Sequence, residues 1–266
     1  MARVIGIPTP RVEGIDKITG TAKYALDIRL PGMLWAKVAQ SPISYGRIKK
    51  IDIRRALETS GVRVIVTGND MAGVRIGRRI YDMPVLAEDV VRYIGEKIVA
   101  VGADTEEAAE QAIDRIEIEY EEMEPLVDSI EAMQATAPLL HPDVLSYRGV
   151  PGNLEAPSNM FIHMSWQKGD IRDGFQRSDM IIENRFKTQV VHQGYLEPHS
   201  CVVAADPSGG AEIWACTKTP FAVREQLSTS LKVAETKFLI LISPVSGSTC
   251  TSAICAATEG TSWMWH

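Results

Sequence analysis

The stretch from Lys97 to Tyr120 constrains the fold most, because a strand, a helix and a second strand follow one another there. Lys97–Val101 is a run of β-favouring residues, and Ile116–Tyr120 alternates apolar with acidic residues, the period of a half-buried strand. Thr105–Arg115 has an alanine-rich face, and Asp104 or Thr105 can cap its first turn by accepting a backbone N–H bond. The unit is typical of a domain that combines helices with a sheet.

Strands and turns fill the rest of the first half. We expect a solvated loop at Pro10–Gly20, a short helix at Arg54–Glu58, and strands at Ala22–Ile28, Leu34–Gln40, Arg47–Ile53, Val62–Thr67 and Val90–Tyr93. Between the last two strands lies a basic cluster of Arg75, Arg78 and Arg79. Such a cluster can contact a phosphate or an acidic partner, but a solvated face is the preferred interpretation.

A proline-rich stretch divides the chain. Residues 125–157 show little periodicity and predict a linker on the surface. Beyond it we expect helices at Ile171–Arg177 and Phe221–Leu231, and strands at Met160–Gln167, Met180–Thr188, Cys201–Ala205, Glu212–Cys216 and Leu239–Ile242. The last portion differs, since Gly247–His266 is rich in Ser, Thr, Ala and Cys and has neither a helical nor a strand period.

The composition argues against several classes of function. Apolar residues make up 45% of the 266 residues and charged residues 23%, which is ordinary for a globular protein. A net charge of −6 gives no basic surface for nucleic acid. No apolar run is long enough to span a membrane, and the N-terminus lacks the apolar core of a signal peptide. The four cysteines form no CxxC pair, so free thiols and a cytoplasmic location are expected.

Polar side chains are concentrated in Val190–His199, which reads Val-Val-His-Gln-Gly-Tyr-Leu-Glu-Pro-His. Burying so many of them is costly unless they bond to one another or to a ligand. A ligand-facing loop and a surface turn before an edge strand both fit this pattern. A metal-dependent hydrolase that uses His192, Glu197 and His199 is disfavoured, because their spacing lacks the i, i+4 register of zinc-binding helices.

Motifs along most of the chain together resemble a known family. They are Asp16–Ile28, Leu30–Leu34, Gln40–Pro42, Arg47–Ile48, Ile51–Asp52, Ala87–Glu96, Val99–Val101, Gly169–Asp170, Ser178–Asp179, Val190–His199 and Trp214–Pro220. In this order, over residues 9–245, they resemble the molybdopterin-binding large subunit of the xanthine dehydrogenase and aldehyde oxidase family of molybdenum hydroxylases.

The resemblance implies an α+β fold in four parts. An α/β hammerhead domain would occupy residues 1–124, a linker 125–157, the N-terminal part of the molybdopterin-binding domain 158–245, and a divergent tail 246–266. It also implies hydroxylation or dehydrogenation of an aldehyde, purine or related small-molecule substrate at a molybdenum–molybdopterin centre. Electrons would leave through iron–sulfur clusters and FAD carried on partner subunits or domains.

The resemblance also assigns provisional roles to residues. An amide suits contact with the metal's oxo group, because it stabilises partial negative charge without an acidic proton. Gln193, or Gln189 slightly upstream, is the candidate. Glu197 and His199 match the family's Leu-Glu-Pro-His pattern, and with His192 they are expected to brace the loop. No catalytic residue and no protein ligand to the metal is assigned, since the family's glutamate base has no counterpart here.

The chain departs from the family after Val245, where Ser246–Cys250 stands in place of a Gly-Gly-x-Phe-Gly segment. The expectation is therefore a truncated or frameshifted product that is inactive alone and retains no cofactor. The alternative is a non-catalytic assembly module that pairs with a separate chain carrying the rest of the cofactor domain.

Overall fold

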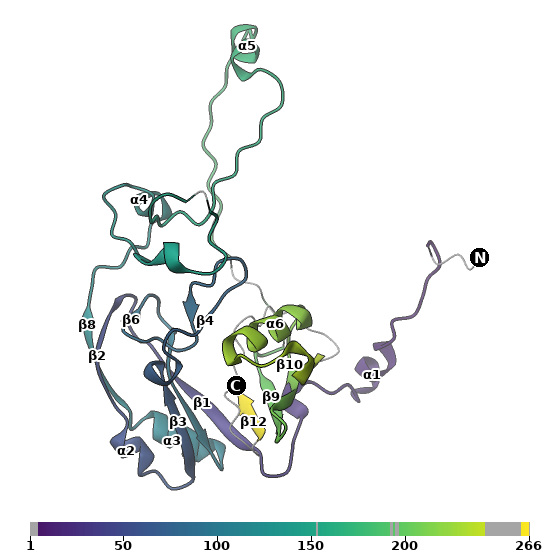
Figure 1. Cartoon of the computed structure of the whole chain (residues 1–266). Coiled ribbons are helices and arrows are strands. Elements are labelled where there is room, and N and C mark those ends of the chain that lie inside the picture. The colour runs from purple at the N-terminus through teal and green to yellow at the C-terminus, as the bar shows by residue number, and fades with distance from the viewer. Residues whose placement is uncertain (1–4, 153, 192–193, 195–196, 243–261, 266) are drawn as a thin grey trace.

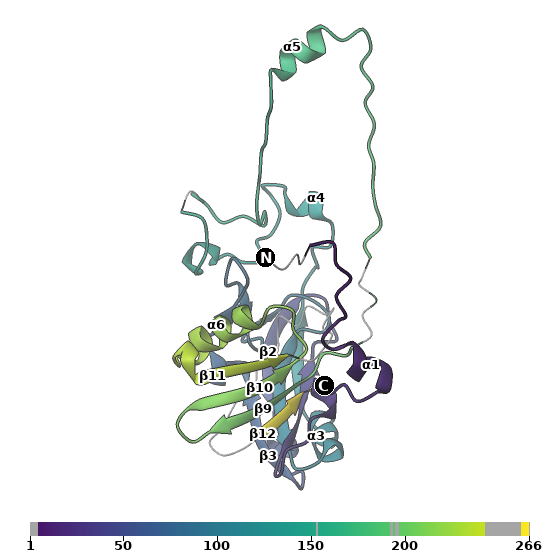
Figure 2. The ribbon, with the colours of Figure 1, turned by 90° about the vertical axis from the view of Figure 1, so that its right-hand side faces the viewer.

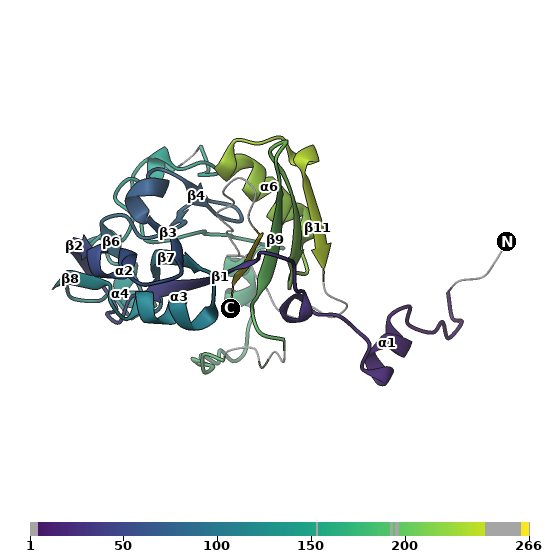
Figure 3. The same cartoon turned by 90° about the horizontal axis from the view of Figure 1, so that it is seen from below.

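The computed structural model describes residues 5–152, 154–191, 194, 197–242 and 262–265. Two sheet-containing halves lie side by side, and a long excursion rises from them (Figure 1). Helix α1 (Gly14–Thr19) stands apart from both halves, as the view from below also shows (Figure 3).

The largest sheet has seven strands in the order β11-β10-β9-β12-β1-β7-β3. They are β1 (Leu34–Gln40), β3 (Val62–Thr67), β7 (Lys97–Ala103), β9 (Cys201–Asp206), β10 (Gly210–Ala215), β11 (Phe238–Ile242) and β12 (Ser262–Trp265). Strands from both halves of the chain therefore belong to one sheet.

Strand β7 is the centre of the first half. Both β1 and β3 pair with it in antiparallel orientation, so neither of its edges is free. Ile98, Val99 and Val101 are at most 1% exposed. Helix α3 (Glu106–Ile113) packs across all three strands. A strand buried on both faces and paired at both edges fixes the register of its neighbours.

A second sheet covers this core. It has three strands in the order β6-β2-β8, namely β6 (Val90–Val91), β2 (Gly46–Asp52) and β8 (Glu117–Glu122). The predicted strand–helix–strand unit is confirmed in its elements, but its two strands join different sheets. Because β1 and β3 occupy both edges of β7, β8 pairs with β2 instead, and its Ile118 and Tyr120 pack toward Ile98 and Val99.

The second half is a hairpin followed by a crossover. β9 and β10 pair antiparallel, as expected, and β11 then lies parallel to β10. Parallel neighbours need a long connection, which helix α6 (Pro220–Leu231) supplies. Leu227 of α6 packs against Val203, Ile213 and Phe238 of the three strands.

Short elements complete the fold, and two of them differ from the prediction. Pro10–Gly20 contains helix α1 instead of an irregular loop, and Ala22–Ile28 is not a strand. There the Asp27 carboxylate accepts a bond from the Tyr24 N–H at 2.9 Å, which closes the 3₁₀ turn η1 (Ala25–Asp27). The remaining short elements are α2 (Arg54–Leu57), η2 (Gly68–Met71), β4 (Arg75–Ile76), β5 (Met83–Pro84), α4 (Ser129–Ala132), η3 (Val144–Ser146) and η4 (Glu235–Lys237).

The excursion, here called the arm, comprises residues 160–191. Helix α5 (Ile171–Gln176) forms its tip, and two extended limbs lead to and from it (Figure 2). The limbs coincide with the strands predicted at Met160–Gln167 and Met180–Thr188, but neither limb pairs with another strand in the described part of the chain. That prediction is wrong for this chain, because the alternating sequence is present and the partner strand is not.

The tail also differs from its expected lack of regular structure. Backbone residues 262–265 form β12, which lies parallel to β1 and antiparallel to β9. The strand's backbone therefore joins the sheet strands of the two halves. Residues 243–261 and 266 lie outside the described residues.

Removing the N-cap of α3 tests how the central unit is held. The Thr105 side chain accepts a bond from the Ala108 N–H at 3.1 Å. We expect Thr105→Ala to lower the free energy of unfolding by about 0.5–2 kcal/mol, measured by urea denaturation. Thr105→Ser keeps the hydroxyl and serves as the control. Equal losses in both variants would contradict a capping role.

Candidate functional site

Three of the five predicted site residues lie in the described part of the chain, on the returning limb of the arm or just before β9. Gln189 sits in extended, exposed backbone. Glu197 is half-buried and His199 exposed, just before β9 begins. His192 and Gln193 lie outside the described residues. The five residues therefore share one segment, and their convergence on a ligand stays a prediction.

The foot of the returning limb is anchored to the turn that precedes α6. The Ser200 N–H donates to Cys216 Sγ at 3.4 Å, and the Cys216 N–H donates to the Ser200 carbonyl oxygen at 3.4 Å. Thr217 Oγ1 in turn accepts a bond from the Thr219 N–H at 3.1 Å. Ser200, Cys216 and Thr217 are at most 3% exposed. The end of the limb is thus fixed, although Gln189, farther along the limb, is exposed.

Sequence reasoning missed this buried polar turn. The Ser200 hydroxyl is buried and has no hydrogen-bond partner among the described residues, which is unusual for a buried polar group. One signal was available, because Trp214–Pro220 stood out as a motif although no role was assigned to its threonines. The partner of that motif, Ser200, gave no signal of its own.

Asn159 holds the base of the outgoing limb. Its Oδ1 accepts a bond from the Leu140 N–H at 3.0 Å, and its Nδ2 donates to the carbonyl oxygens of Pro138 and Ala132 at 2.9 and 3.2 Å. One side chain therefore ties the base of the arm to three residues of the linker. A lone asparagine is not distinctive in a sequence, so this role could not be read from it.

A cavity of about 310 Å³ lies beside this base and is lined by Asp82, His141, Asn159 and His163 together with apolar residues. His141 Nδ1 lies 3.3 Å from the Tyr147 hydroxyl. Burial, aided by the charge of Arg92, lowers the pKa of His141, so its imidazole is neutral at pH 7. Among the described residues, no three His, Cys, Asp or Glu side chains are grouped as metal ligands.

The donor chemistry of the Gln189–His199 segment fits one side of an anionic or oxo-bearing cofactor. Gln189 offers neutral amide donors, and the limb that carries it is exposed along residues 183–191. In the described part of the chain no strand pairs with this limb. The exposed residues 183–191 can therefore contact a cofactor from one side.

Two family models match the chain. Residues 19–124 match the a/b hammerhead domain of aldehyde oxidase and xanthine dehydrogenase. Residues 153–248 match the molybdopterin cofactor-binding domain, which covers the arm and strands β9 to β11. No helix in the described residues has the length and apolar character needed to cross a membrane.

Curated relatives match over nearly the whole chain. A probable xanthine dehydrogenase subunit of Bacillus subtilis is 34% identical over 90% of this chain and 30% of its own length. The nicotinate dehydrogenase large molybdopterin subunit of Eubacterium barkeri is 28% identical over 92% of this chain and 55% of its own length. The chain thus spans between about a third and about half of these relatives.

Solved structures share the fold. The chain superposes on reconstituted CO dehydrogenase from Oligotropha carboxidovorans with a TM-score of 0.80 and 25% identity, covering 98% of this chain and 34% of that one. Quinoline 2-oxidoreductase from Pseudomonas putida 86 gives a TM-score of 0.79 at 23% identity, over 100% of this chain and 35% of that one.

Replacing Asn159 tests whether it ties the arm to the linker. We expect Asn159→Ala to speed amide hydrogen exchange across residues 132–140, because the Leu140 N–H loses its acceptor and two carbonyls lose their donor. Mass spectrometry of peptides from that segment gives the readout. Ser158→Ala, which removes one local bond to the Met160 N–H, should leave the segment unchanged. Equal exchange in all three proteins would contradict the assignment.

Proposed function

Because the chain belongs to the xanthine dehydrogenase and aldehyde oxidase family, we propose that it builds one wall of a molybdenum-cofactor site. The enzyme so formed is an oxidoreductase that hydroxylates or dehydrogenates an aldehyde, purine or related small molecule. The match of residues 153–248 to the molybdopterin cofactor-binding domain supports the proposal that the site holds this cofactor. When bound, a molybdenum–pterin centre supplies two-electron redox chemistry.

In the proposed site, the residues of this chain hold and orient the cofactor. Gln189, or Gln193 beyond the described residues, donates an amide N–H to the polar face of the cofactor. Glu197 and His199 brace the foot of the limb, beside the buried Ser200 and Cys216 turn. Neither residue is assigned a proton-transfer step.

The proposal that further polypeptide completes the site rests on the arm, whose limbs pair with no strand in the described part of the chain. Trp166 is 85% exposed and Phe186 88% exposed, one on each limb. Other large apolar side chains exposed along the arm are Met160, Phe161, Ile162, Met164, Ile171, Phe175, Met180, Ile181, Ile182, Val190 and Val191. An apolar surface of this extent marks an interface, and each such side chain contributes about 1.5–3 kcal/mol when fully buried.

The completing polypeptide corresponds to the length of the relatives that this chain does not span. The Bacillus subtilis relative extends over more than three times the matched region, since the match covers 30% of it. Iron–sulfur and flavin groups on further subunits or domains would carry the electrons away. We infer that the 266 residues alone are inactive.

The same arm also supports the alternative of a non-catalytic assembly module. In that case the exposed limbs dock a separate chain that carries the rest of the cofactor domain, and the amides of the returning limb contact no cofactor. The two hypotheses differ in one respect, namely whether Gln189 or Gln193 affects the molybdenum centre once the complex is assembled.

Cofactor loading of the assembled complex tests the proposal. The chain is purified alone and after co-expression with a polypeptide equivalent to the unmatched length of the Bacillus subtilis relative. We expect molybdenum far below one atom per chain in the first sample and clear enrichment with a pterin absorption in the second, measured by metal analysis and visible spectroscopy. Molybdenum near one atom per isolated chain would contradict the need for completion.

Matched variants separate the two hypotheses. Gln189→Leu and Gln193→Leu remove the amides, and Gln167→Leu removes an amide from the opposite limb as a control. We expect one of the first pair to reduce turnover of the assembled complex at unchanged co-purification, while Gln167→Leu has no effect. Full turnover in both site variants would favour the assembly module.

A further inference from the structure

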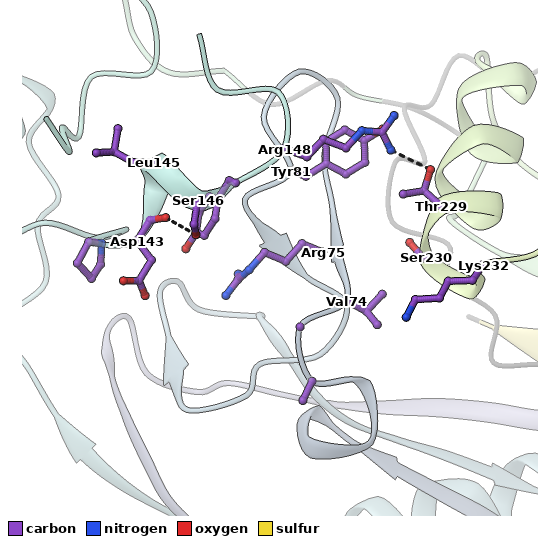
Figure 4. A pocket seen from close by; sticks show the side chains of 14 residues that line it. Val74, Arg75, Tyr81, Asp143, Leu145, Ser146, Arg148, Thr229, Ser230 and Lys232 are labelled. Carbon is purple, nitrogen blue, oxygen red and sulfur yellow. Dashed lines mark hydrogen bonds between the residues drawn. The ribbon is translucent and has the colours of Figure 1, made fainter. Parts of the chain in front are cut away.

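A large cavity lies where three distant segments of the chain meet. It has a volume of about 760 Å³ and is lined by residues 72–75 and 81, 142–143 and 145–148, and 229–230 and 232 (Figure 4). These segments belong to the β4 region, the linker and the C-terminal end of α6. Ligand pockets in proteins usually measure about 300–1,000 Å³, so this cavity can hold a small molecule. None of the predicted molybdenum-site residues lines it.

Positive charge gathers at this cavity in a chain whose net charge is −6. Arg75, Arg148 and Lys232 line it, and Asp143 is the one carboxylate among the lining residues that the structure describes. Figure 4 shows the three cations entering from different segments, with Arg75 from the β4 region, Arg148 from the linker and Lys232 from the end of α6. A concave surface of this charge attracts anions.

Aromatic rings hold both guanidinium groups in place. Arg75 Cζ lies 4.7 Å from the centre of the Tyr147 ring, and Arg148 Cζ lies 4.5 Å from the centre of the Tyr81 ring. Arg148 also donates to Thr229 Oγ1 at 3.0 Å. A guanidinium stacked on a ring keeps N–H groups along its edge for an oxyanion, so these two arginines are oriented in advance.

The backbone around Arg148 is built to keep it there. The Tyr81 N–H donates to the Arg148 carbonyl oxygen at 2.9 Å, which joins the β4 region to the linker. Gly149 follows with a φ of +84°, and a Cβ at this position would lie 1.8 Å from the Arg79 carbonyl oxygen. Only glycine permits this close approach. The pairing of Arg148 with Tyr81 therefore depends on a specific local sequence.

Lys232 occupies a position that usually belongs to glycine. It is the C-cap of α6, with φ 55° and ψ 37°, and it is the one non-glycine residue with positive φ in the described chain. Glycine is the common residue in this left-handed conformation because it lacks a Cβ. A lysine there is unfavourable for the backbone, and it places an ammonium group at the rim of the cavity (Figure 4).

One acidic residue, Glu225, forms an ion pair with a cation of the cavity. Glu225 Oε1 lies 3.4 Å from Arg148 Nη2 and accepts a bond from the Tyr81 hydroxyl at 3.4 Å. Both side chains of this ion pair are about half exposed, and pairs of this kind contribute little. An incoming anion can therefore compete with Glu225 for Arg148.

We propose that this cavity binds a phosphorylated small molecule through Arg75, Arg148 and Lys232. Arginine forks match the geometry of phosphoryl oxygens, and lysine adds a point charge. The limited volume of the cavity favours a small molecule over nucleic acid, which needs a longer basic surface. The basic cluster predicted from Arg75, Arg78 and Arg79 is thus divided, because Arg75 faces the cavity and the other two are exposed.

Binding of inorganic pyrophosphate to the full chain tests the proposal by isothermal titration calorimetry at low ionic strength. We expect saturable binding of one pyrophosphate per chain that weakens as salt is added. Lys232→Gly should bind about tenfold more weakly. This variant removes the charge while suiting the positive φ, so it should fold at least as stably as the wild type. Glu225→Gln should bind more tightly, because a competing carboxylate is removed.

Lys218→Gln is the matched control, since Lys218 is an exposed lysine just before α6 that does not line the cavity. Its affinity should equal that of the wild type. The proposal is overturned if pyrophosphate shows no saturable binding at concentrations on the order of 10 mM, or if Lys218→Gln weakens binding as much as Lys232→Gly. A hexaglutamate peptide that binds more tightly than pyrophosphate, with the same dependence on Lys232, would overturn it in favour of an acidic polypeptide.

Discussion

An extended backbone must find partners for its N–H and C=O groups, and this requirement organises the molecule. Strand β7 meets it completely, because β1 and β3 pair with both of its edges while apolar clusters cover its faces. The two limbs of the arm have comparable strand sequences, but no strand pairs with either limb in the described part of the chain. The first half therefore has a packed hydrophobic core. The cofactor-binding half has a paired sheet, but the limbs of its arm pair with no strand in the described part of the chain.

The parts of the fold that depend on local sequence could be predicted. The helix over Thr105–Arg115, the strand at Val62–Thr67 and the hairpin before α6 all appear close to their expected bounds. Pairing between distant strands could not be predicted, because period alone does not say which edge is free. For this reason the pairing of β8 with β2 could not be predicted. For the same reason, the limbs at 160–167 and 180–188 have the residue alternation of strands but no hydrogen-bonded partner strand in the described part of the chain.

The candidate site could be located by its family motif more readily than by its geometry. The motif Val190–His199 contains Glu197 and His199, and Gln189 directly precedes it, but the wall opposite them has no counterpart in the described residues. Asn159 ties the start of the outgoing limb to the linker, Ser200 is held against Cys216 just before β9, and nothing in the sequence context of either residue distinguishes it. The anion cavity shows the same limit, because Arg148 and Lys232 lie far apart in the sequence and meet Arg75 only through the fold.

Hydrogen exchange of the arm amides tests whether the two limbs lack partner strands until further polypeptide binds. The amides of residues 160–167 and 180–188 are compared in the isolated chain and in the complex with the completing polypeptide. We expect exchange near the rate of an unstructured peptide in the isolated chain and strong protection of both limbs in the complex. Strong protection of both limbs in the isolated chain would contradict it, since the strands would then have found their partners within these 266 residues.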